Sequence, residues 1–171
     1  MHRWHSLYLG LGSNLGRRRA VLAKAVEQLD AMGSCRVRRL SSLYETEPEG
    51  AGSNWYLNLV VSMETTLDPE EFLARILDME KLLGRNRSRP WPDRTMDIDI
   101  LLWENKVITE NHLVVPHPRL HQRLFVLVPL AELDPETMHP VLHISATQML
   151  HRAPPARIRA VGTLEGSVSR A

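Results

Sequence analysis

Two aspartates separated by one residue, Asp97 and Asp99, carry the sharpest chemical signal in the sequence. On a β-strand, residues i and i+2 point to the same face and lie about 6.6 Å apart. The opposite face would carry the apolar residues of the segment, which are Met96, Ile98, Ile100 and Leu102. Two neighbouring carboxylates repel each other, and a pair of magnesium ions that also bind phosphate oxygens would remove this conflict. The alternative is a solvated strand face on which Asp97 pairs with a nearby arginine.

The segment just before these aspartates is rich in arginine. Over ten residues it holds one acid, Asp93, and four arginines, which are Arg85, Arg87, Arg89 and Arg94. A guanidinium group donates in a planar fork that fits phosphate oxygens, and it stays charged at neutral pH. Arginines beside metal-binding carboxylates suit phosphoryl transfer, because negative charge shifts among phosphate oxygens in the transition state. A solvated loop is the alternative, and the adjacent aspartates favour the functional interpretation.

A segment of clean alternation, residues 56–65, carries a second candidate pair. Its core face is formed by Leu57, Leu59, Val61 and Met63. Tyr56 and Asn58 lie on the other face, where an aromatic ring and an amide together suit a planar heterocycle, by stacking and by paired hydrogen bonds. An ordinary polar sheet surface is the alternative.

Two other motifs do not match the patterns of dinucleotide, P-loop or zinc sites. The turn Gly10-Leu11-Gly12-Ser13-Asn14-Leu15-Gly16 has Leu15 where a dinucleotide fingerprint needs its third glycine, and no Gly-Lys-Ser/Thr follows as in a P-loop. We interpret it as a structural turn, so any use of ATP occurs without a P-loop. His117 and His121 have helical i, i+4 spacing, but Pro118 disturbs the helix that would align them, and we expect no zinc there.

Length and composition describe an ordinary globular domain. The 171 residues are 43% hydrophobic and 24% charged, with a formal charge of +1. This balance gives no global reason to expect nucleic acid or an anionic membrane as a partner. Cys35 is the single cysteine, and no apolar run is long enough to span a membrane. We expect a cytoplasmic protein.

The order of expected elements predicts the fold class. A strand at 6–12 is followed by a helix over 21–32, a strand within 35–45, the strand at 56–65, a helix that begins at Asp68-Pro69, and a strand at 96–103. This is the split β-α-β order of a ferredoxin-like α+β sandwich, with one antiparallel sheet and helices on one side.

C-terminal additions follow this unit. We expect a short strand near 107–108, an extended piece at 113–116, a helix that begins around 119–122 and that Pro129 limits or kinks, and a helix at 146–151 capped by Ser145. Residues 153–171 lack apolar periodicity, which predicts a flexible tail after a single domain of residues 1–152.

With these residues in place, the chain resembles the 6-hydroxymethyl-7,8-dihydropterin pyrophosphokinase family of folate biosynthesis over residues 7–150. The strongest similarity is Arg94-Thr95-Met96-Asp97-Ile98-Asp99, which matches the family pattern Arg-x-x-Asp-hydrophobic-Asp. Further matches follow in family order: the glycine turn at 10–16, Tyr44-x-Thr46-x-Pro48, Tyr56-x-Asn58, Val115-Pro116-His117-Pro118 and Arg123-x-Phe125.

The resemblance implies transfer of diphosphate from MgATP to the hydroxymethyl group of the pterin, with release of AMP. It implies two magnesium ions on Asp97 and Asp99, and catalytic arginines at Arg85 and Arg94. The implied pterin-binding residues are Thr46, Glu49, Tyr56, Asn58 and Phe125. The implied ATP-binding residues are Glu80, Arg87, Trp91, Ile100, His117 and Arg123. Small molecules would be the partners of a monomer, with neither nucleic acid nor membrane involved.

Some positions depart from the family pattern, and two rival functions stay open. Glu49 stands where an apolar residue is common, and Pro92-Asp93 and Ser88 alter the arginine-rich loop. One rival is a related magnesium-dependent phosphoryl or nucleotidyl transferase with another acceptor. The other is a ferredoxin-like nucleic-acid-binding module, which two exposed acids on the sheet disfavour because they would repel phosphate.

Overall fold

A computed structural model describes residues 3–48, 54–84 and 95–164 of the chain. Within these ranges no helix combines the length and the apolar character needed to cross a membrane. The elements, in chain order, are β1 (His5–Ser13), α1 (Arg18–Ala31), β2 (Cys35–Leu40), β3 (Tyr44–Thr46), β4 (Tyr56–Thr65), α2 (Pro69–Leu82), β5 (Asp97–Trp103), β6 (Ile108–Glu110), β7 (Leu113–Val115), a 3-10 helix (Leu120–Gln122), α3 (Leu124–Leu133), α4 (Ala146–Arg152) and β8 (Ile158–Ala160).

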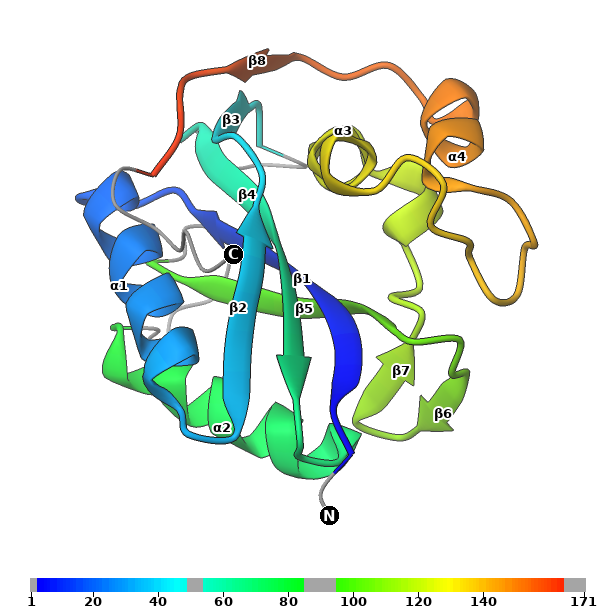
Figure 1. Cartoon of the computed structure of the whole chain (residues 1–171). Coiled ribbons are helices and arrows are strands. Elements are labelled where there is room, and N and C mark those ends of the chain that lie inside the picture. The colour runs from blue at the N-terminus through cyan, green and yellow to red at the C-terminus, as the bar shows by residue number, and fades with distance from the viewer. Residues whose placement is uncertain (1–2, 49–53, 85–94, 165–171) are drawn as a thin grey trace.

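One antiparallel sheet organises the molecule, as the sequence predicts (Figure 1). Its strand order is β5-β1-β4-β3-β8, and β2 pairs with the end of β4 that β3 leaves uncovered. β2 and β3 therefore act as one interrupted strand along β4, with β2 opposite residues 61–65 and β3 opposite residues 56–58. β6 and β7 form a separate two-stranded sheet.

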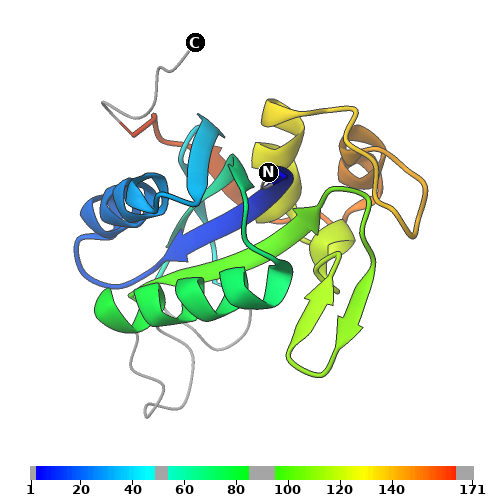
Figure 2. The ribbon, with the colours of Figure 1, turned by 60° about the horizontal axis from the view of Figure 1, so that its bottom comes forward.

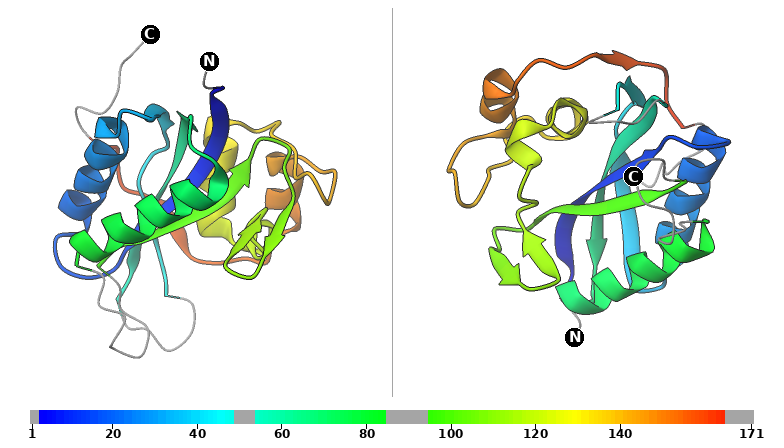
Figure 3. Two further views of the ribbon diagram at one scale, coloured as in Figure 1. Left: turned by 90° about the horizontal axis from the view of Figure 1, so that it is seen from below. Right: turned by 180° about the vertical axis from the view of Figure 1, so that it is seen from behind.

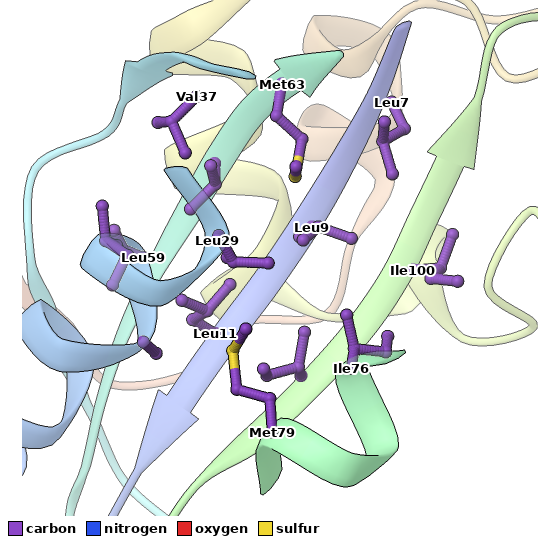
Figure 4. Packing of buried hydrophobic residues seen from close by; sticks show 14 of the residues in the cluster. Leu7, Leu9, Leu11, Leu29, Val37, Leu59, Met63, Ile76, Met79 and Ile100 are labelled. Carbon is purple, nitrogen blue, oxygen red and sulfur yellow. The ribbon is translucent and has the colours of Figure 1, made fainter. Parts of the chain in front are cut away.

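Helices cover both faces of the sheet. The two helices expected before residue 96, α1 and α2, share one face as predicted, and the helices of the C-terminal additions cover the other. α1 and α2 pack on one face over a core that includes Leu9, Leu29 and Ile76 (Figure 4). α3 and α4 lie across the sheet from them (Figures 2 and 3). Their residues form a second core cluster with Val60 and Leu102. The C-terminal additions thus supply the layer on the second face of the sheet.

A β-bulge near the end of β5 changes which side chains share a face. The register with β1 shifts so that Leu9 pairs with Ile100 and Tyr8 with Leu102, leaving Leu101 as an extra residue. Ile100 lies in the core under α2, whereas Leu101 and Leu102 pack in the cluster formed with α3. The prediction that Leu102 shares the core face of Met96, Ile98 and Ile100 is wrong, because strict alternation ends at this extra residue.

Local signals place most of the helices correctly. Asp68 caps α2 by accepting a hydrogen bond from Glu71 N at 2.9 Å, and Ser145 forms a capping box with Gln148 at the start of α4. The helix expected from 119–122 is divided, because Arg123 has an extended backbone between the 3-10 turn and α3. Pro129 lies inside α3 and does not end it.

Part of the segment predicted as a flexible tail belongs to the sheet. Ile158–Ala160 forms β8 and pairs with β3, and Leu164 is buried in the core beside α1. The expectation of a loose tail from Ala153 is therefore wrong for these residues. Three residues are too few to give a periodic pattern, and the pairing is made by backbone groups that every sequence provides.

Candidate active site

Strand register gathers the candidate residues into a row across the sheet. Gly12 of β1 lies opposite Asn58 of β4 on one side and opposite Asp97 of β5 on the other. Gly10, two residues earlier, lies opposite Asp99. The period of two predicted from the sequence therefore places both aspartates and Asn58 on the face covered by α3.

Gly12 leaves a space beside Asn58 that the side chain of any other residue would fill. A Cβ atom built on Gly12 would lie 2.7 Å from Asn58 Oδ1, which is closer than real contacts of this kind. A Cβ on Gly10 would lie 3.4 Å from the Leu101 side chain. The glycine segment interpreted as a structural turn thus also forms the floor between the amide and the two carboxylates.

A pocket of about 510 Å³ opens above this floor. Seven of the residues predicted for the site line it: Thr46, Tyr56, Asn58, Asp97, Asp99, Arg123 and Phe125. Aromatic rings and an amide lie on one side of Gly12 and the carboxylates on the other. We call the side with Thr46, Tyr56, Asn58 and Phe125 the acceptor half, because the family resemblance would place the molecule that accepts the transferred group there, and we call the side with Asp97 and Asp99 the carboxylate half. Its volume falls within the range of ordinary small-molecule sites.

The acceptor half is built around a buried amide. Asn58 is 5% exposed, and its Nδ2 donates a hydrogen bond to Thr46 Oγ1 at 2.8 Å. This bond fixes the orientation of the amide within the pocket. Tyr56 comes from the same strand and Phe125 from the start of α3, with the guanidinium carbon of Arg123 at 5.3 Å from the Phe125 ring centroid. Rings beside a fixed amide suit a flat heterocycle with polar edges.

Next to the carboxylate half, but not lining the pocket itself, a neutral histidine lies beside Asp99. His117 Nδ1 accepts a hydrogen bond from Arg119 N at 3.1 Å, which leaves the proton on Nε2, 3.9 Å from Asp99 Oδ2. Burial, and after it the positive charge of Arg123, lowers the pKa of His117 to about 4, although the charge of Asp97 opposes the shift. At neutral pH this imidazole therefore adds no charge, and its N–H faces the carboxylate.

The donor set of this half fits a hard divalent cation. Asp97 and Asp99 are both partly accessible from the pocket and supply oxygen ligands, which magnesium prefers. Among the described residues no group of three or more His, Cys, Asp or Glu side chains could hold a metal. Two carboxylates alone leave coordination positions for water and substrate oxygens, as is usual for magnesium.

Three predicted nucleotide-side residues do not line the pocket: Glu80, Ile100 and His117, of which His117 lies beside Asp99. Glu80 of α2 is buried and accepts a hydrogen bond from Ile98 N at 2.8 Å, so it holds β5 from the opposite face of the sheet. The Ile100 side chain is in the core under α2, which leaves only its backbone accessible to a ligand. Glu49, Arg85, Arg87, Trp91 and Arg94 lie outside the described residues, and their roles stay predictions.

Two charged residues of the pocket were missed by sequence reasoning. Glu47 and Arg119 line the pocket, although each stands within or directly after a motif that the sequence does display, Tyr44-x-Thr46-x-Pro48 and Val115-Pro116-His117-Pro118. A charged residue directly beside such a motif was the available signal. The spacing of Glu47 and Arg119 in the sequence did not show that these residues face the pocket.

The lowered pKa of His117 predicts a pH dependence of stability. The unfolded chain binds a proton at this imidazole below pH 6.5, whereas the folded protein does so only near pH 4. Between these values protonation favours the unfolded chain, so the free energy of unfolding should fall as the pH is lowered through this window. Urea unfolding without magnesium at pH 7 and pH 5 should show a smaller loss for His117→Gln than for the wild type. An equal loss in both proteins would contradict the assignment.

Comparison with known proteins agrees with this geometry. Residues 8–135 match the family model described as 7,8-dihydro-6-hydroxymethylpterin-pyrophosphokinase (HPPK). The 2-amino-4-hydroxy-6-hydroxymethyldihydropteridine pyrophosphokinase of Methylorubrum extorquens is 45% identical over 130 residues, covering 75% of this chain and 82% of that protein. The protein of the same name from Bacillus subtilis is 44% identical over 127 residues, covering 74% of this chain and 76% of that protein.

Solved structures show the same fold. A crystal structure of Plasmodium falciparum HPPK-DHPS superposes with a TM-score of 0.71 at 18% identity, covering 89% of this chain. The chain spans 45% of that longer protein. The sheet, the pocket and the sequence matches together define a transferase of the pyrophosphokinase class, which acts in folate biosynthesis. The chain belongs to the 7,8-dihydro-6-hydroxymethylpterin-pyrophosphokinase family.

Proposed function

We propose that this chain transfers the diphosphate group of MgATP to the hydroxymethyl group of 6-hydroxymethyl-7,8-dihydropterin, giving AMP and the pterin diphosphate. The observation that carries the proposal is a single pocket lined by a ring-and-amide acceptor half and by a pair of carboxylates one residue apart. A flat acceptor and a negatively charged donor bound in these two halves would meet above Gly12. The 35–45% identity with proteins named for this activity supports the choice of acceptor.

In the acceptor half, the side chains would fix the orientation of the pterin. The Asn58 amide, held by Thr46, would recognise the polar edge of the heterocycle, and Tyr56 and Phe125 would contact its faces. Such preorganised groups lower the entropy cost of bringing the hydroxyl to the phosphorus. An amide already fixed by Thr46 loses little further freedom when the ligand binds.

In the carboxylate half, Asp97 and Asp99 would hold magnesium, for which the resemblance implies two ions. When bound, magnesium neutralises charge on the phosphate oxygens of the donor and orients them. Arg119 and Arg123 bring positive charge to the same pocket and would contact donor oxygens directly. The neutral His117, whose Nε2 lies 3.9 Å from Asp99 Oδ2, would place an N–H dipole near this carboxylate without adding charge.

We also infer a ferredoxin-like classification for the core of the sheet. It is supported by the order β5-β1-β4-β2 and by the placement of α1 and α2 on one face, with α3 and α4 as additions. A cytoplasmic monomer that binds neither nucleic acid nor membrane remains our expectation from the sequence.

Product analysis tests the proposed function. The protein is incubated with ATP, magnesium chloride and 6-hydroxymethyl-7,8-dihydropterin, and the nucleotides are separated by chromatography. We expect one AMP per pterin diphosphate formed, with both products absent when EDTA replaces magnesium. ADP as the product would indicate transfer of a single phosphoryl group. Free diphosphate would indicate nucleotidyl transfer, and either result would reject the proposal.

Arg94→Ala tests the role proposed for the arginine-rich loop. Loss of one donor that stabilises the transition state typically lowers kcat by about 10²-fold or more. We expect such a fall in kcat with the dissociation constant of the pterin changed by less than about threefold, because Arg94 is assigned to phosphate and not to the acceptor. Single-turnover quench-flow separates the chemical step from product release. An unchanged chemical rate would remove Arg94 from the catalytic residues.

A further inference from the structure

A segment beyond the family match forms part of the framework of the acceptor half. The match ends at residue 135, whereas residues 157–164, here called the C-terminal strap, return to the sheet and include β8. Tyr44 lies opposite Ala160 and Thr46 opposite Ile158 in the pairing of β3 with β8. Figure 1 shows β8 running alongside β3 at the end of the sheet.

Backbone bonds continue this pairing past both ends of β3. Val161 N donates to Leu43 O at 2.8 Å, and Leu43 N donates to Gly162 O at 2.7 Å. At the other end, Glu47 N donates to Arg157 O at 3.3 Å. β3 is only three residues long, so it would be a short edge strand if β8 did not cover it. β3 therefore pairs with β4 along one edge and with the strap along the other.

Side chains add specific contacts between the strap and the pocket wall. Arg157 N donates to Glu47 Oε1 at 3.2 Å, and Arg157 Nε lies 3.8 Å from Glu47 Oε2. Glu47 lines the pocket together with Thr46, whose hydroxyl fixes the Asn58 amide. A smaller hollow of about 210 Å³ is lined both by the chain at 154–158 and by four residues of the main pocket, which are Thr46, Glu47, Arg123 and Phe125.

The far end of the strap is fastened to the core. Arg19 of α1 donates to Thr163 O at 2.6 Å and to Val161 O at 3.0 Å. Leu164 is buried, and Gly162 has φ +106°, a conformation that favours glycine. These contacts connect α1 to β3 through the strap.

We propose that the C-terminal strap is a positioning element for the acceptor, which holds Thr46 and Glu47 where a flat ligand contacts them. The inference rests on the proposed function for the identity of the acceptor, and its mechanical part does not depend on that function. It assigns the strap an effect mainly on acceptor affinity, because its hydrogen bonds to the pocket wall are made to Leu43 and Glu47, on either side of the segment that holds Thr46.

A matched pair of proline substitutions in the full chain tests this role. Val161→Pro removes the N–H that donates to Leu43 O. Ala160→Pro is the control. Bonds at residues 157 and 161 imply, by the alternation of an antiparallel ladder, that the N–H of residue 160 points away from β3. Both variants are compared with the wild type by circular dichroism and by steady-state kinetics for each substrate.

We expect Val161→Pro to raise the KM for the pterin acceptor by about tenfold. Such a change corresponds to about 1.4 kcal/mol, which is the size of the net contribution of one hydrogen bond. Its kcat and its KM for ATP should stay within about twofold of the wild type, and Ala160→Pro should match the wild type throughout. A general folding defect would lower kcat or affect both substrates. Equal acceptor KM values for the two variants, or an equal change for both substrates in Val161→Pro, would overturn the proposal.

Amide hydrogen exchange gives a readout that does not require activity. Val161→Pro should accelerate exchange in a peptide covering residues 43–47 relative to Ala160→Pro, and unchanged exchange would overturn the proposal even if the wild type produces no AMP. If Val161→Pro does not fold, Arg157→Ala tests the strap at the other end of β3, where the exposed Arg157 side chain pairs with Glu47. It should raise the acceptor KM by about threefold, as for an exposed ion pair, and Arg157→Lys should restore it. Wild-type KM in Arg157→Ala would then reject the proposal.

Discussion

Asp97→Asn is expected to lower kcat by about 10³-fold or more under saturating magnesium and ATP. The substitution keeps the size of the side chain and removes one of the two negative charges that would hold magnesium in the pocket. Metal ions contribute several kcal/mol of charge stabilisation in such reactions, and about 1.4 kcal/mol corresponds to a tenfold change in rate. The pterin should bind almost normally, because Asn58 and Thr46 lie on the other side of Gly12.

The measurement is kcat at several magnesium concentrations, together with calorimetric binding of the pterin. Asp68→Asn is a suitable control, since asparagine caps a helix as well as aspartate does and Asp68 lies at the start of α2. It should leave kcat unchanged. Magnesium-dependent turnover near the wild-type level in Asp97→Asn would remove the metal assignment.

Asn58→Leu is expected to lower kcat/KM for the pterin by about 10³-fold. Leucine has a similar size, but it offers no hydrogen bond to the acceptor and leaves the buried Thr46 hydroxyl without its donor. An amide can make two hydrogen bonds to the polar edge of the acceptor, and each partner left buried without its bond costs about 1–3 kcal/mol, so losing both corresponds to roughly this loss. The Thr46 hydroxyl lacks its donor in the free protein as well, so that change lowers stability and not kcat/KM. The effect should fall on pterin binding, with the dissociation constant of MgATP nearly unchanged.

Thr46→Val tests how much of this loss arises because Thr46 no longer fixes the orientation of the Asn58 amide. It removes the hydroxyl that accepts from Asn58 Nδ2 and leaves the amide itself in the pocket. We expect a smaller loss of about tenfold, and the double variant should be no worse than Asn58→Leu alone because both changes break one contact. Additive losses in this cycle would show that Thr46 contacts the acceptor independently of Asn58.

The sequence predicts the part of the site that depends on strand periodicity. Asp97 and Asp99 face one pocket, and Tyr56 and Asn58 share it, because side chains two apart on a strand point the same way. Phe125 and Arg123 were assigned only through the family resemblance. They come from the region of α3, and the packing of that helix on the sheet depends on contacts far apart in the chain.

The departures have local physical causes. The bulge at Leu101 reverses alternation at Leu102, and an apolar segment gives no sign of an inserted residue. The strap was missed because its pairing with β3 uses backbone groups, and its side chains near β8 are largely exposed. Glu47 lines the pocket and accepts a hydrogen bond from Arg157 of the strap, a contact between residues far apart in the chain that the motif around Thr46 does not reveal.

The most direct test of the central claim is a crystal structure with manganese in place of magnesium and a non-hydrolysable ATP analogue. We predict anomalous density for manganese within about 2.2 Å of carboxylate oxygens of both Asp97 and Asp99, with phosphate oxygens completing the coordination. A fully bound nucleotide with no metal peak beside β5, and with both carboxylates paired to protein cations, would contradict the account.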